Sequence, residues 1–354
     1  MKTILVTGAG GYIGSVLVPK LLNKGYSVKA IDRFFFGVDK LQPHPNLTIV
    51  HEDCRRLTES YFVGIDAVID LVAISNDPSG ELFKEITYDI NHLSRVNTAS
   101  LAKKMGVKRY ILPSTCSIYG FQDKEAIVDE NSLTNPLTVY AKANEKAEQG
   151  VIPLADDGFT VTVMRQATVY GYSPRMRFDL AVNGMTFGAW EKGVIPLMRD
   201  GAQWRPMVHV EDTTDVMCLL LEAEANKING EIFNIGSNRN NYQLGRLADE
   251  IATALPIDVK IEWYGDPDHR SYRVNFDKIV KTLNWEAKYT AADGALEIFK
   301  KLEDGTLQKT EQTITLNWYK KLIEWHGFIK QIDLYGGVLE IEERDSSKDL
   351  IILS

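Results

Sequence analysis

Three glycines near the N-terminus have the spacing of a phosphate-binding turn. Gly8, Gly11 and Gly14 lie in TGAGGYIG, after an apolar run that ends at Thr7 and before apolar residues at helical spacing. Glycine permits a tight turn and lets the backbone approach a pyrophosphate, and the N-terminus of the next helix presents free N–H groups. A strand before the turn and a helix after it therefore predict a dinucleotide-binding site.

An acidic residue at the end of the next predicted strand supports this interpretation. Asp32 lies 18 residues after Gly14. A carboxylate there can accept two hydrogen bonds from the adenosine ribose diol and repels a 2′-phosphate, which favours NAD over NADP. Arg33 follows directly, and a basic side chain at that place can accommodate a 2′-phosphate, so NADP is the alternative cofactor.

The elements that must position these residues alternate between strands and helices. Because such alternation implies right-handed βαβ units, we predict an α/β fold of the Rossmann type, with a doubly wound parallel sheet. The segment AVIDLV is apolar apart from Asp70, as a strand covered on both faces should be. Strands are predicted over 2–7, 26–32, 47–53, 67–73, 107–114, 159–171 and 231–236, and helices over 12–25, 82–106 and 137–149.

The C-terminal half is less regular, and its strand at 231–236 suggests that two parts of the chain interleave. We predict a dinucleotide-binding domain over 1–171, with returning segments near 207–237, and a smaller, mainly substrate-binding domain over 172–304. Residues 305–354 form a C-terminal helix and tail. The segment 314–329 is amphipathic, and residues 342–354 are expected to be loosely held.

Composition and charge narrow the class of protein. The chain has 354 residues, 44% of them hydrophobic, and a formal net charge of -8. This acidic balance argues against a nucleic-acid or membrane-surface partner, and no apolar run approaches the roughly 20 residues of a membrane helix. Cys54, Cys116 and Cys218 have no metal-binding spacing. We therefore expect a cytoplasmic protein with no metal site.

The glycine spacing, with LVA at 71–73, STCSIYG at 114–120 and YAKAN at 140–144, resembles the extended short-chain dehydrogenase/reductase family. The nucleotide-sugar epimerases and dehydratases of that family are the most similar, over about residues 1–290. The resemblance implies an NAD-dependent enzyme that transfers a hydride at a carbon of a nucleoside-diphosphate sugar. By family analogy it also implies a homodimer that pairs the helices containing Asn91 and Tyr140.

The same resemblance assigns the catalytic residues. Tyr140 corresponds to the family's acid/base, whose phenolate takes the hydroxyl proton of the sugar while the hydride leaves carbon. Thr115 corresponds to the hydroxyl partner that orients the reacting oxygen. The family's 4,6-dehydratases carry an Asp-Glu pair after this threonine, and its decarboxylases keep the glutamate. Cys116 and Ser117 stand there instead, which leaves epimerisation or simple oxidation and reduction.

The chain departs from the family pattern four residues after Tyr140. Asn144 stands where the family has a lysine that binds the nicotinamide ribose and lowers the pKa of the tyrosine. Asn144 shares a helix face with Tyr140 and can keep the first role. It carries no charge, and a unit charge about 6 Å away is worth roughly 3 kcal/mol, or about two pKa units. The sequence alone therefore predicts that Asn144→Lys raises activity at neutral pH.

The sequence allows three consequences of Asn144. In the first, the enzyme works best at alkaline pH; in the second, the fold supplies another basic group; in the third, catalysis is lost and only binding is kept. The alternatives to an epimerase or dehydrogenase are accordingly a non-catalytic dinucleotide-binding sensor or scaffold and an NADP-dependent ketosugar reductase.

The remaining site residues also follow from the resemblance. Asp53 is similar to the acid that binds the adenine amine, and Arg205 and Arg270 are similar to arginines that bind the diphosphate. The other predicted cofactor contacts are Tyr12, Ile13, Cys54, Leu71 and Ala73. The other predicted substrate contacts are Ser75, Thr168 and Asn183.

Overall fold

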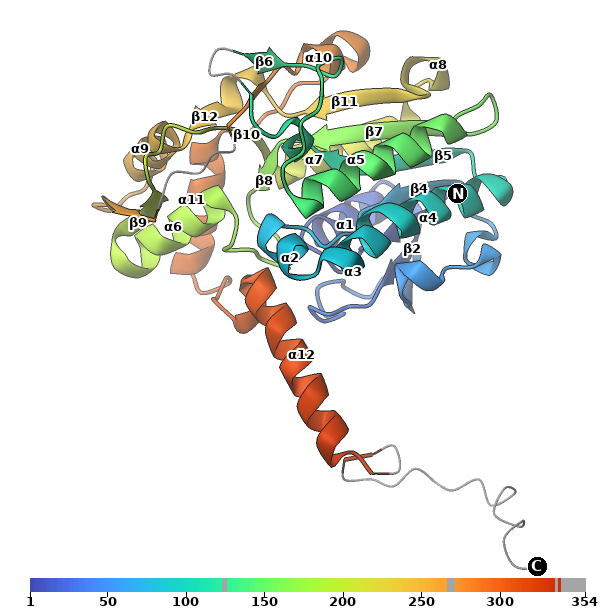
Figure 1. Ribbon diagram of the computed structural model, residues 1–354, viewed down its shortest axis with the longest axis horizontal. Coiled ribbons are helices and arrows are strands. Elements are labelled where there is room, and N and C mark those ends of the chain that lie inside the picture. The colour runs from blue at the N-terminus through green and yellow to red at the C-terminus, as the bar shows by residue number, and fades with distance from the viewer. Residues whose placement is uncertain (123–125, 266–270, 335–336, 339–354) are drawn as a thin grey trace, which may run out of the picture.

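Seven parallel strands form the central sheet of the computed structural model, which describes residues 1–122, 126–265, 271–334 and 337–338. The strand order is β11-β7-β5-β4-β1-β2-β3, so the chain runs outward in both directions from β1 (Figure 1). This order confirms the predicted doubly wound sheet and places a topological switch point beside β1, between it and β4. The strands are β1 (Thr3–Thr7), β2 (Ser27–Asp32), β3 (Leu47–His51), β4 (Ala67–Asp70), β5 (Arg109–Thr115), β7 (Thr160–Gln166) and β11 (Glu231–Ile235).

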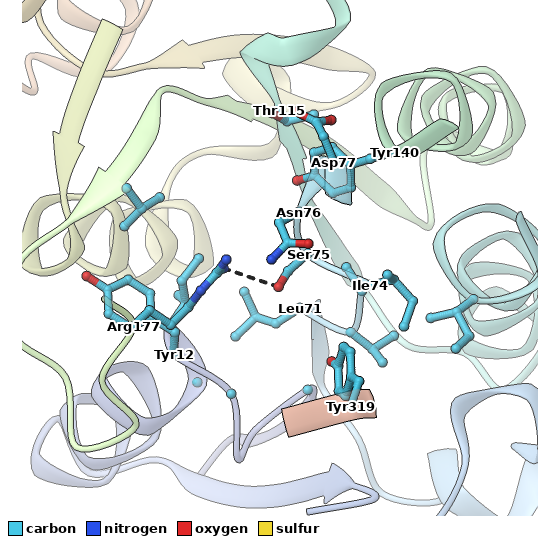
Figure 2. Close-up of a pocket in the computed structure, with 18 of the residues that line it drawn as sticks. Tyr12, Leu71, Ile74, Ser75, Asn76, Asp77, Thr115, Tyr140, Arg177 and Tyr319 are labelled. Atoms are coloured by element: carbon cyan, nitrogen blue, oxygen red, sulfur yellow. Dashed lines mark hydrogen bonds between the residues drawn. The ribbon is translucent and has the colours of Figure 1, made fainter. Parts of the chain in front are cut away.

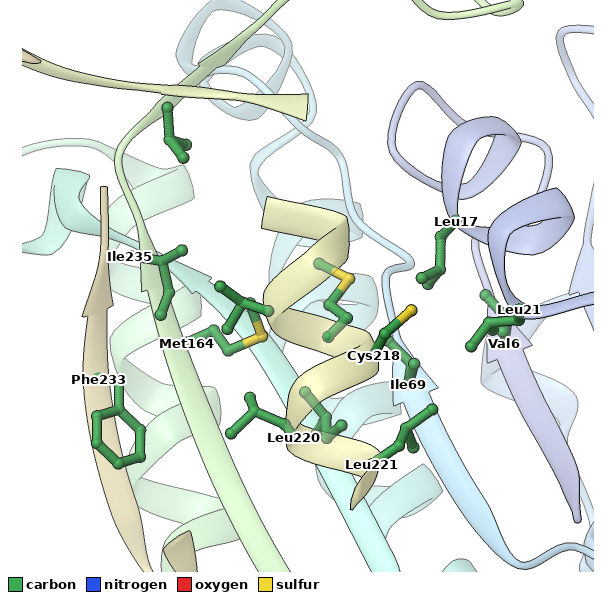
Figure 3. Close-up of a cluster of buried hydrophobic side chains, with 14 of the residues drawn as sticks. Val6, Leu17, Leu21, Ile69, Met164, Cys218, Leu220, Leu221, Phe233 and Ile235 are labelled. Carbon is green, nitrogen blue, oxygen red and sulfur yellow. The ribbon is translucent and has the colours of Figure 1, made fainter. Parts of the chain in front are cut away.

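Helices cover both faces of this sheet. Because side chains alternate along a strand, Val6 and Ile69 pack into one layer while Leu5 and Val68 pack into the other. The first layer, part of which Figure 3 shows, is completed by α1 and α7, and the second by α4 and α5. These helices are α1 (Gly14–Asn23), α4 (Arg95–Lys104), α5 (Val139–Val151) and α7 (Val210–Glu222).

The segment 82–106 is not the single helix that the sequence predicts. Two short helices, α2 (Asp77–Leu82) and α3 (Lys84–Tyr88), lead into a π-helical segment, η3 (Asp89–Ser94), before α4 begins at Arg95. A π-helical turn accommodates an additional residue, so side chains beyond it are rotated relative to a regular helix. Asn91 in this turn is buried and bonds both backbone groups of Ile74, at 2.8 and 3.0 Å.

The predicted strand over 159–171 is also divided. β7 ends at Gln166, and β8 (Thr168–Tyr170) leaves the large sheet to pair with β10 (Trp204–His209). β12 (Asn241–Gln243) completes this small sheet, and β11 returns to the large one. The remaining elements are β6 (Ile127–Val128), α6 (Ala181–Lys192), β9 (Val194–Met198), α8 (Ala225–Ile228), α9 (Leu244–Ala254), β13 (Lys260–Tyr264), β14 (Arg273–Val274), α10 (Asp277–Leu283) and α11 (Ala291–Glu303).

The amphipathic segment near the C-terminus forms the predicted helix, α12 (Thr315–Ile332), which projects from the body in Figure 1. Its first turns are anchored, because Trp318 is buried and its indole Nε1 donates to the carbonyl of Phe35 at 2.6 Å. Residues 342–354 lie outside the described part of the chain. Among the helices of the described ranges, none has the length and apolar character needed to cross a membrane.

Candidate active site

A cavity of about 980 Å³ lies at the carboxyl ends of the central strands, where the strand order reverses. Its volume is at the upper end of the range for small-molecule sites. Residues from the glycine turn, the ends of β2, β4 and β5, the segment before α6 and the helix α12 line it. Figure 2 shows Thr115 and Tyr140 together on one side, with Tyr12 and Arg177 across the cavity.

The glycine turn is shaped for close approach of a ligand to the backbone. Gly8 has φ +64°, and a Cβ there would lie 2.7 Å from the backbone nitrogen of Val72. A Cβ on Gly14 would lie 2.5 Å from the carbonyl oxygens of Gly8 and Ala9. No side chain caps the N-terminus of α1, and the residues around it line the cavity. This geometry fits a pyrophosphate bound at a helix N-terminus.

Asp32 is fixed by the backbone around it. Its Oδ2 accepts from the amide of Gly10 at 3.0 Å and its Oδ1 accepts from the amide of Phe34 at 2.8 Å. Burial raises the pKa of this carboxyl, which lines the cavity. Arg33 is engaged nearby, with Nη1 3.3 Å from Oδ2 of Asp53 and its guanidinium 4.7 Å from the ring of Phe35.

The other predicted cofactor residues gather at the same cavity. A hydrogen bond with Arg55 lowers the pKa of Asp53 to about 2, so this acid is charged at neutral pH. Which of these residues contact a cofactor stays a prediction. The predicted cofactor residues that line the cavity are Gly8, Gly11, Tyr12, Ile13, Gly14, Asp32, Arg33, Asp53, Cys54, Leu71 and Ala73.

Tyr140 and Thr115 meet across two elements. Thr115 ends β5, and Tyr140 lies in the first turn of α5, which Thr138 caps by accepting from the amide of Ala141. The side chains of Thr115 and Tyr140 lie together at the wall of the cavity, as Figure 2 shows. Burial raises the pKa of Tyr140, and the positive charge of Arg95 is the largest influence that opposes this increase.

Asn144 does not lie at the surface of the cavity. It is buried, its Nδ2 donates to the carbonyl of Tyr140 at 2.8 Å, and its Oδ1 accepts from Nη1 of Arg95 at 2.8 Å. The predicted contact with a nicotinamide ribose stays a prediction. Sequence reasoning missed Arg95, because the π-helical turn before it places it toward Asn144 in a way that regular helical spacing does not indicate.

The predicted substrate residues are divided between the cavity and its support. Ser75, Thr168 and Arg205 line the cavity, and the guanidinium of Arg205 lies 5.5 Å from the ring of Tyr272. Asn183 does not line the cavity. It is buried, and its side-chain amide donates to the hydroxyl of Tyr12, a lining residue, at 3.1 Å. Arg270 lies outside the described residues.

The segment before α6 adds residues that sequence reasoning missed. Arg177 pairs with Asp179 at 2.8 Å and donates to Ser75 Oγ at 3.2 Å (Figure 2). Despite the burial of Asp179, the charge of Arg177 lowers its pKa to about 2. Arg175 lies 3.6 Å from the ring of Phe36, and burial lowers its pKa to about 9. The only sequence signal was the gathering of Arg and Pro in YSPRMRFD.

The sequence is similar to a family of known proteins. The model of the NAD dependent epimerase/dehydratase family matches residues 4–236. A probable UDP-arabinose 4-epimerase of Arabidopsis thaliana is 27% identical over 330 residues, with 83% of this chain and 79% of the relative covered. A UDP-glucuronate 4-epimerase of Thermodesulfobacterium geofontis is 25% identical over 342 residues, with coverage of 92% and 98%.

A solved structure has the same fold. The UDP-glucuronic acid 4-epimerase of Bacillus cereus, in complex with UDP-glucuronic acid and NAD, aligns with a TM-score of 0.76. The alignment covers 85% of this chain and 99% of the solved chain, at 22% sequence identity.

Proposed function

The chain belongs to the NAD-dependent epimerase/dehydratase family, and we propose that it inverts the configuration at carbon 4 of a UDP-sugar, with NAD as its cofactor. The observation that carries this proposal is that Thr115 and Tyr140 lie together at the wall of a cavity that begins at the glycine turn (Figure 2). The pair provides a proton-transfer group beside a dinucleotide-binding turn.

The cofactor side of the cavity fits NAD better than NADP. The glycine turn and the N-terminus of α1 would hold the pyrophosphate, and Asp32 would accept from the adenosine ribose. A 2′-phosphate would meet the carboxylate of Asp32, while Arg33, the cation that could receive it, is engaged with Asp53 and Phe35. When bound, NAD would supply a reversible hydride acceptor for a carbon of the sugar.

Tyr140 would move the proton that accompanies this chemistry. Its phenolate would take the proton of a sugar hydroxyl and later return it, and Thr115 would hold the reacting oxygen by a hydrogen bond. For inversion, the hydrogen must return to the opposite face of carbon 4, so the oxidised sugar ring must be able to turn over within the site. The protein therefore has to bind the nucleoside diphosphate firmly and the sugar ring less firmly. Arg205, which lines the cavity, would bind the diphosphate.

The residues around Thr115 favour epimerisation over elimination of water. Ser117 lines the cavity where a dehydratase would need a carboxylic acid, and a serine hydroxyl is a poor general acid. Cys116 is buried, with its Sγ 3.2 Å from the carbonyl of Arg165, and burial raises its pKa well above the usual value. It is a packed thiol and not a nucleophile.

We also propose that the protein is a cytoplasmic homodimer without a nucleic-acid or membrane partner. Leu82 and Leu93 are exposed on α2 and η3, next to the helix that carries Tyr140, and would be covered by a second copy. Sedimentation of the protein and of a Leu93→Glu variant tests this, because dimerisation through this face predicts a dimer for the first and a monomer for the second.

Product analysis tests the proposed function. The purified protein is incubated with UDP-glucuronate, UDP-xylose or UDP-glucose, and the products are separated and identified by NMR. We expect one of these sugars to reach equilibrium with its 4-epimer without added nicotinamide cofactor, and denatured protein to release NAD. Release of NAD without turnover of any nucleotide sugar would favour a dinucleotide-binding sensor, and release of NADP would favour a reductase.

A further inference from the structure

Arg95 occupies an unusual place for a cation. It begins α4 directly after the π-helical segment η3, and its side chain is only 2% exposed. Its guanidinium donates from Nε to the carbonyl of Val72 at 3.0 Å, from Nη2 to the carbonyl of Asp70 at 3.1 Å and from Nη1 to Oδ1 of Asn144 at 2.8 Å. All three acceptors are neutral, so these bonds hold the charge in place without neutralising it.

Asn144 connects this cation to the helix that carries Tyr140. Its Oδ1 accepts from Arg95, and its Nδ2 donates to the backbone carbonyl of Tyr140, one helical turn earlier. A lysine at this buried position would bring a second cation close to Arg95, because Nη1 of Arg95 lies only 2.8 Å from Oδ1 of Asn144, and two unpaired like charges are costly in a buried space. The amide of Asn144 is complementary to a guanidinium, because it offers an oxygen to the N–H groups of Arg95.

We propose that Arg95, held by Asn144, is a positioning residue that supplies the positive charge needed to stabilise the phenolate of Tyr140, in place of the family's lysine at position 144. The proposal rests on the proposed role of Tyr140 in catalysis. In this arrangement the charge comes from α4 on one side of Tyr140 and not from α5, the helix of Tyr140 itself.

The other charged groups around Tyr140 do not replace Arg95. Asp77 on α2 acts in the opposite direction, because its negative charge disfavours a phenolate. Arg177 lies across the cavity and is paired with Asp179, and its influence on Tyr140 is smaller than that of Arg95. Lys142 and Lys146 on α5 are exposed.

The acid beside Arg95 does not neutralise it by a direct ion pair. Asp70 is buried, and its carboxyl oxygens accept hydrogen bonds from Thr7 and from Tyr110, the latter at 2.5 Å. The guanidinium bonds to the backbone carbonyl of Asp70 instead. Burial raises the pKa of this carboxyl, and the charge of Arg95 is the largest influence that opposes the increase.

Substitution of Arg95 separates its charge from its packing. Arg95→Gln removes the charge and keeps an amide N–H donor for the carbonyls, Arg95→Lys keeps the charge, and Lys142→Gln is a control that removes an exposed cation from α5. The fourth variant is the double substitution Arg95→Gln/Asn144→Lys, which returns a cation to the helix of Tyr140. The variants are compared only over the pH range in which circular dichroism shows all of them folded.

The first readout is the titration of Tyr140 itself, which needs neither substrate nor turnover. Tyrosine labelled at the phenol carbon is incorporated, and the NMR signal of Tyr140 is assigned by its loss in Tyr140→Phe. In Arg95→Gln we expect the pKa of Tyr140 to rise by about one to two units. It should stay close to that of the wild type in Arg95→Lys and Lys142→Gln, and the double substitution should restore it.

The second readout is the pH dependence of kcat. A base must be deprotonated, so removal of the cation should move the rising limb of the profile to higher pH, with a roughly ten- to hundredfold loss at neutral pH that shrinks as the pH is raised. An unchanged Tyr140 titration in Arg95→Gln would overturn the proposal, as would a wild-type phenol that stays protonated throughout. A shifted titration in a protein without epimerase activity would support the role of Arg95 and reject the proposed function.

Discussion

At the residue scale, the proposed chemistry depends on the phenol of Tyr140 and on the groups that change its pKa. Burial raises the pKa of Tyr140. In the family pattern a lysine lowers the pKa of this tyrosine, and this chain has Asn144 in its place. The structure offers Arg95 instead, bonded to the residue that replaced the lysine. Thr115, at the end of β5, lies beside this phenol at the wall of the cavity.

Removal of the phenol hydroxyl should separate binding from catalysis. Tyr140→Phe keeps the ring and removes the proton-transfer group, so we expect kcat to fall by roughly a hundred- to ten-thousand-fold. Affinity for NAD, measured by calorimetry, should stay within a factor of a few. Full activity of this variant would remove Tyr140 from its proposed role.

Substitution of Asn144 by the family's lysine should destabilise the protein and should not increase its activity. The sequence alone predicts a gain of activity for Asn144→Lys, but the structure reverses this expectation, because the new ammonium would be buried against the guanidinium of Arg95. We expect the free energy of unfolding to fall by about 2 kcal/mol or more from like-charge repulsion. Denaturant titration measures this loss, and a variant that is as stable as the wild type and more active at neutral pH would contradict it.

At the element scale, turns and irregular segments position the site, and they differ in how far the sequence reveals them. The glycine turn could be predicted because glycine spacing and flanking periodicity are both local signals. The π-helical segment η3 could not be, because its register depends on Asn91 bonding the loop after β4, a contact 17 residues away in sequence. Arg95 could not be assigned to the site for the same reason.

The glycine turn should tolerate no side chain at its third glycine. In Gly14→Ala the Cβ would lie 2.5 Å from two carbonyl oxygens, so the turn must shift. We expect a loss of about 1–3 kcal/mol in the free energy of unfolding and a weaker affinity for NAD.

A glycine in open space provides the matched control. Gly327 lies within α12, and a Cβ there would meet no atom within 4 Å. Gly327→Ala should leave NAD affinity unchanged and stabilise the helix by up to about 1 kcal/mol. Equal effects of the two substitutions on NAD binding would show that the turn is not a cofactor site.

At the scale of the whole molecule, the site is assembled from parts of the chain that are far apart in sequence. The cavity is lined by the N-terminal turn, the ends of three central strands, the segment before α6 and the helix α12. The large sheet could be predicted from alternating strands and helices. The contribution of α12 could not, because amphipathic spacing indicates that a helix packs on something but not which surface it covers.

Such an assembly links cofactor binding to stability. A ligand that binds only the folded state stabilises it by about 2.7 kcal/mol at a concentration one hundred times its Kd. NAD should therefore raise the Tm of protein stripped of bound nucleotide, and NADP at the same concentration should raise it less, because Asp32 disfavours a 2′-phosphate. Differential scanning calorimetry measures both, and a larger shift with NADP would contradict the assignment of NAD.

Epimerisation at carbon 4 with NAD requires that a hydrogen leave that carbon of the sugar and return to the same carbon from within the site. The most direct measurement is NMR of the protein with its UDP-sugar in deuterated water. We predict that the 4-epimer accumulates with its original hydrogen retained at carbon 4 and with no deuterium from the solvent. A product that carries solvent deuterium at that carbon, or no epimer from any UDP-sugar, would contradict the account.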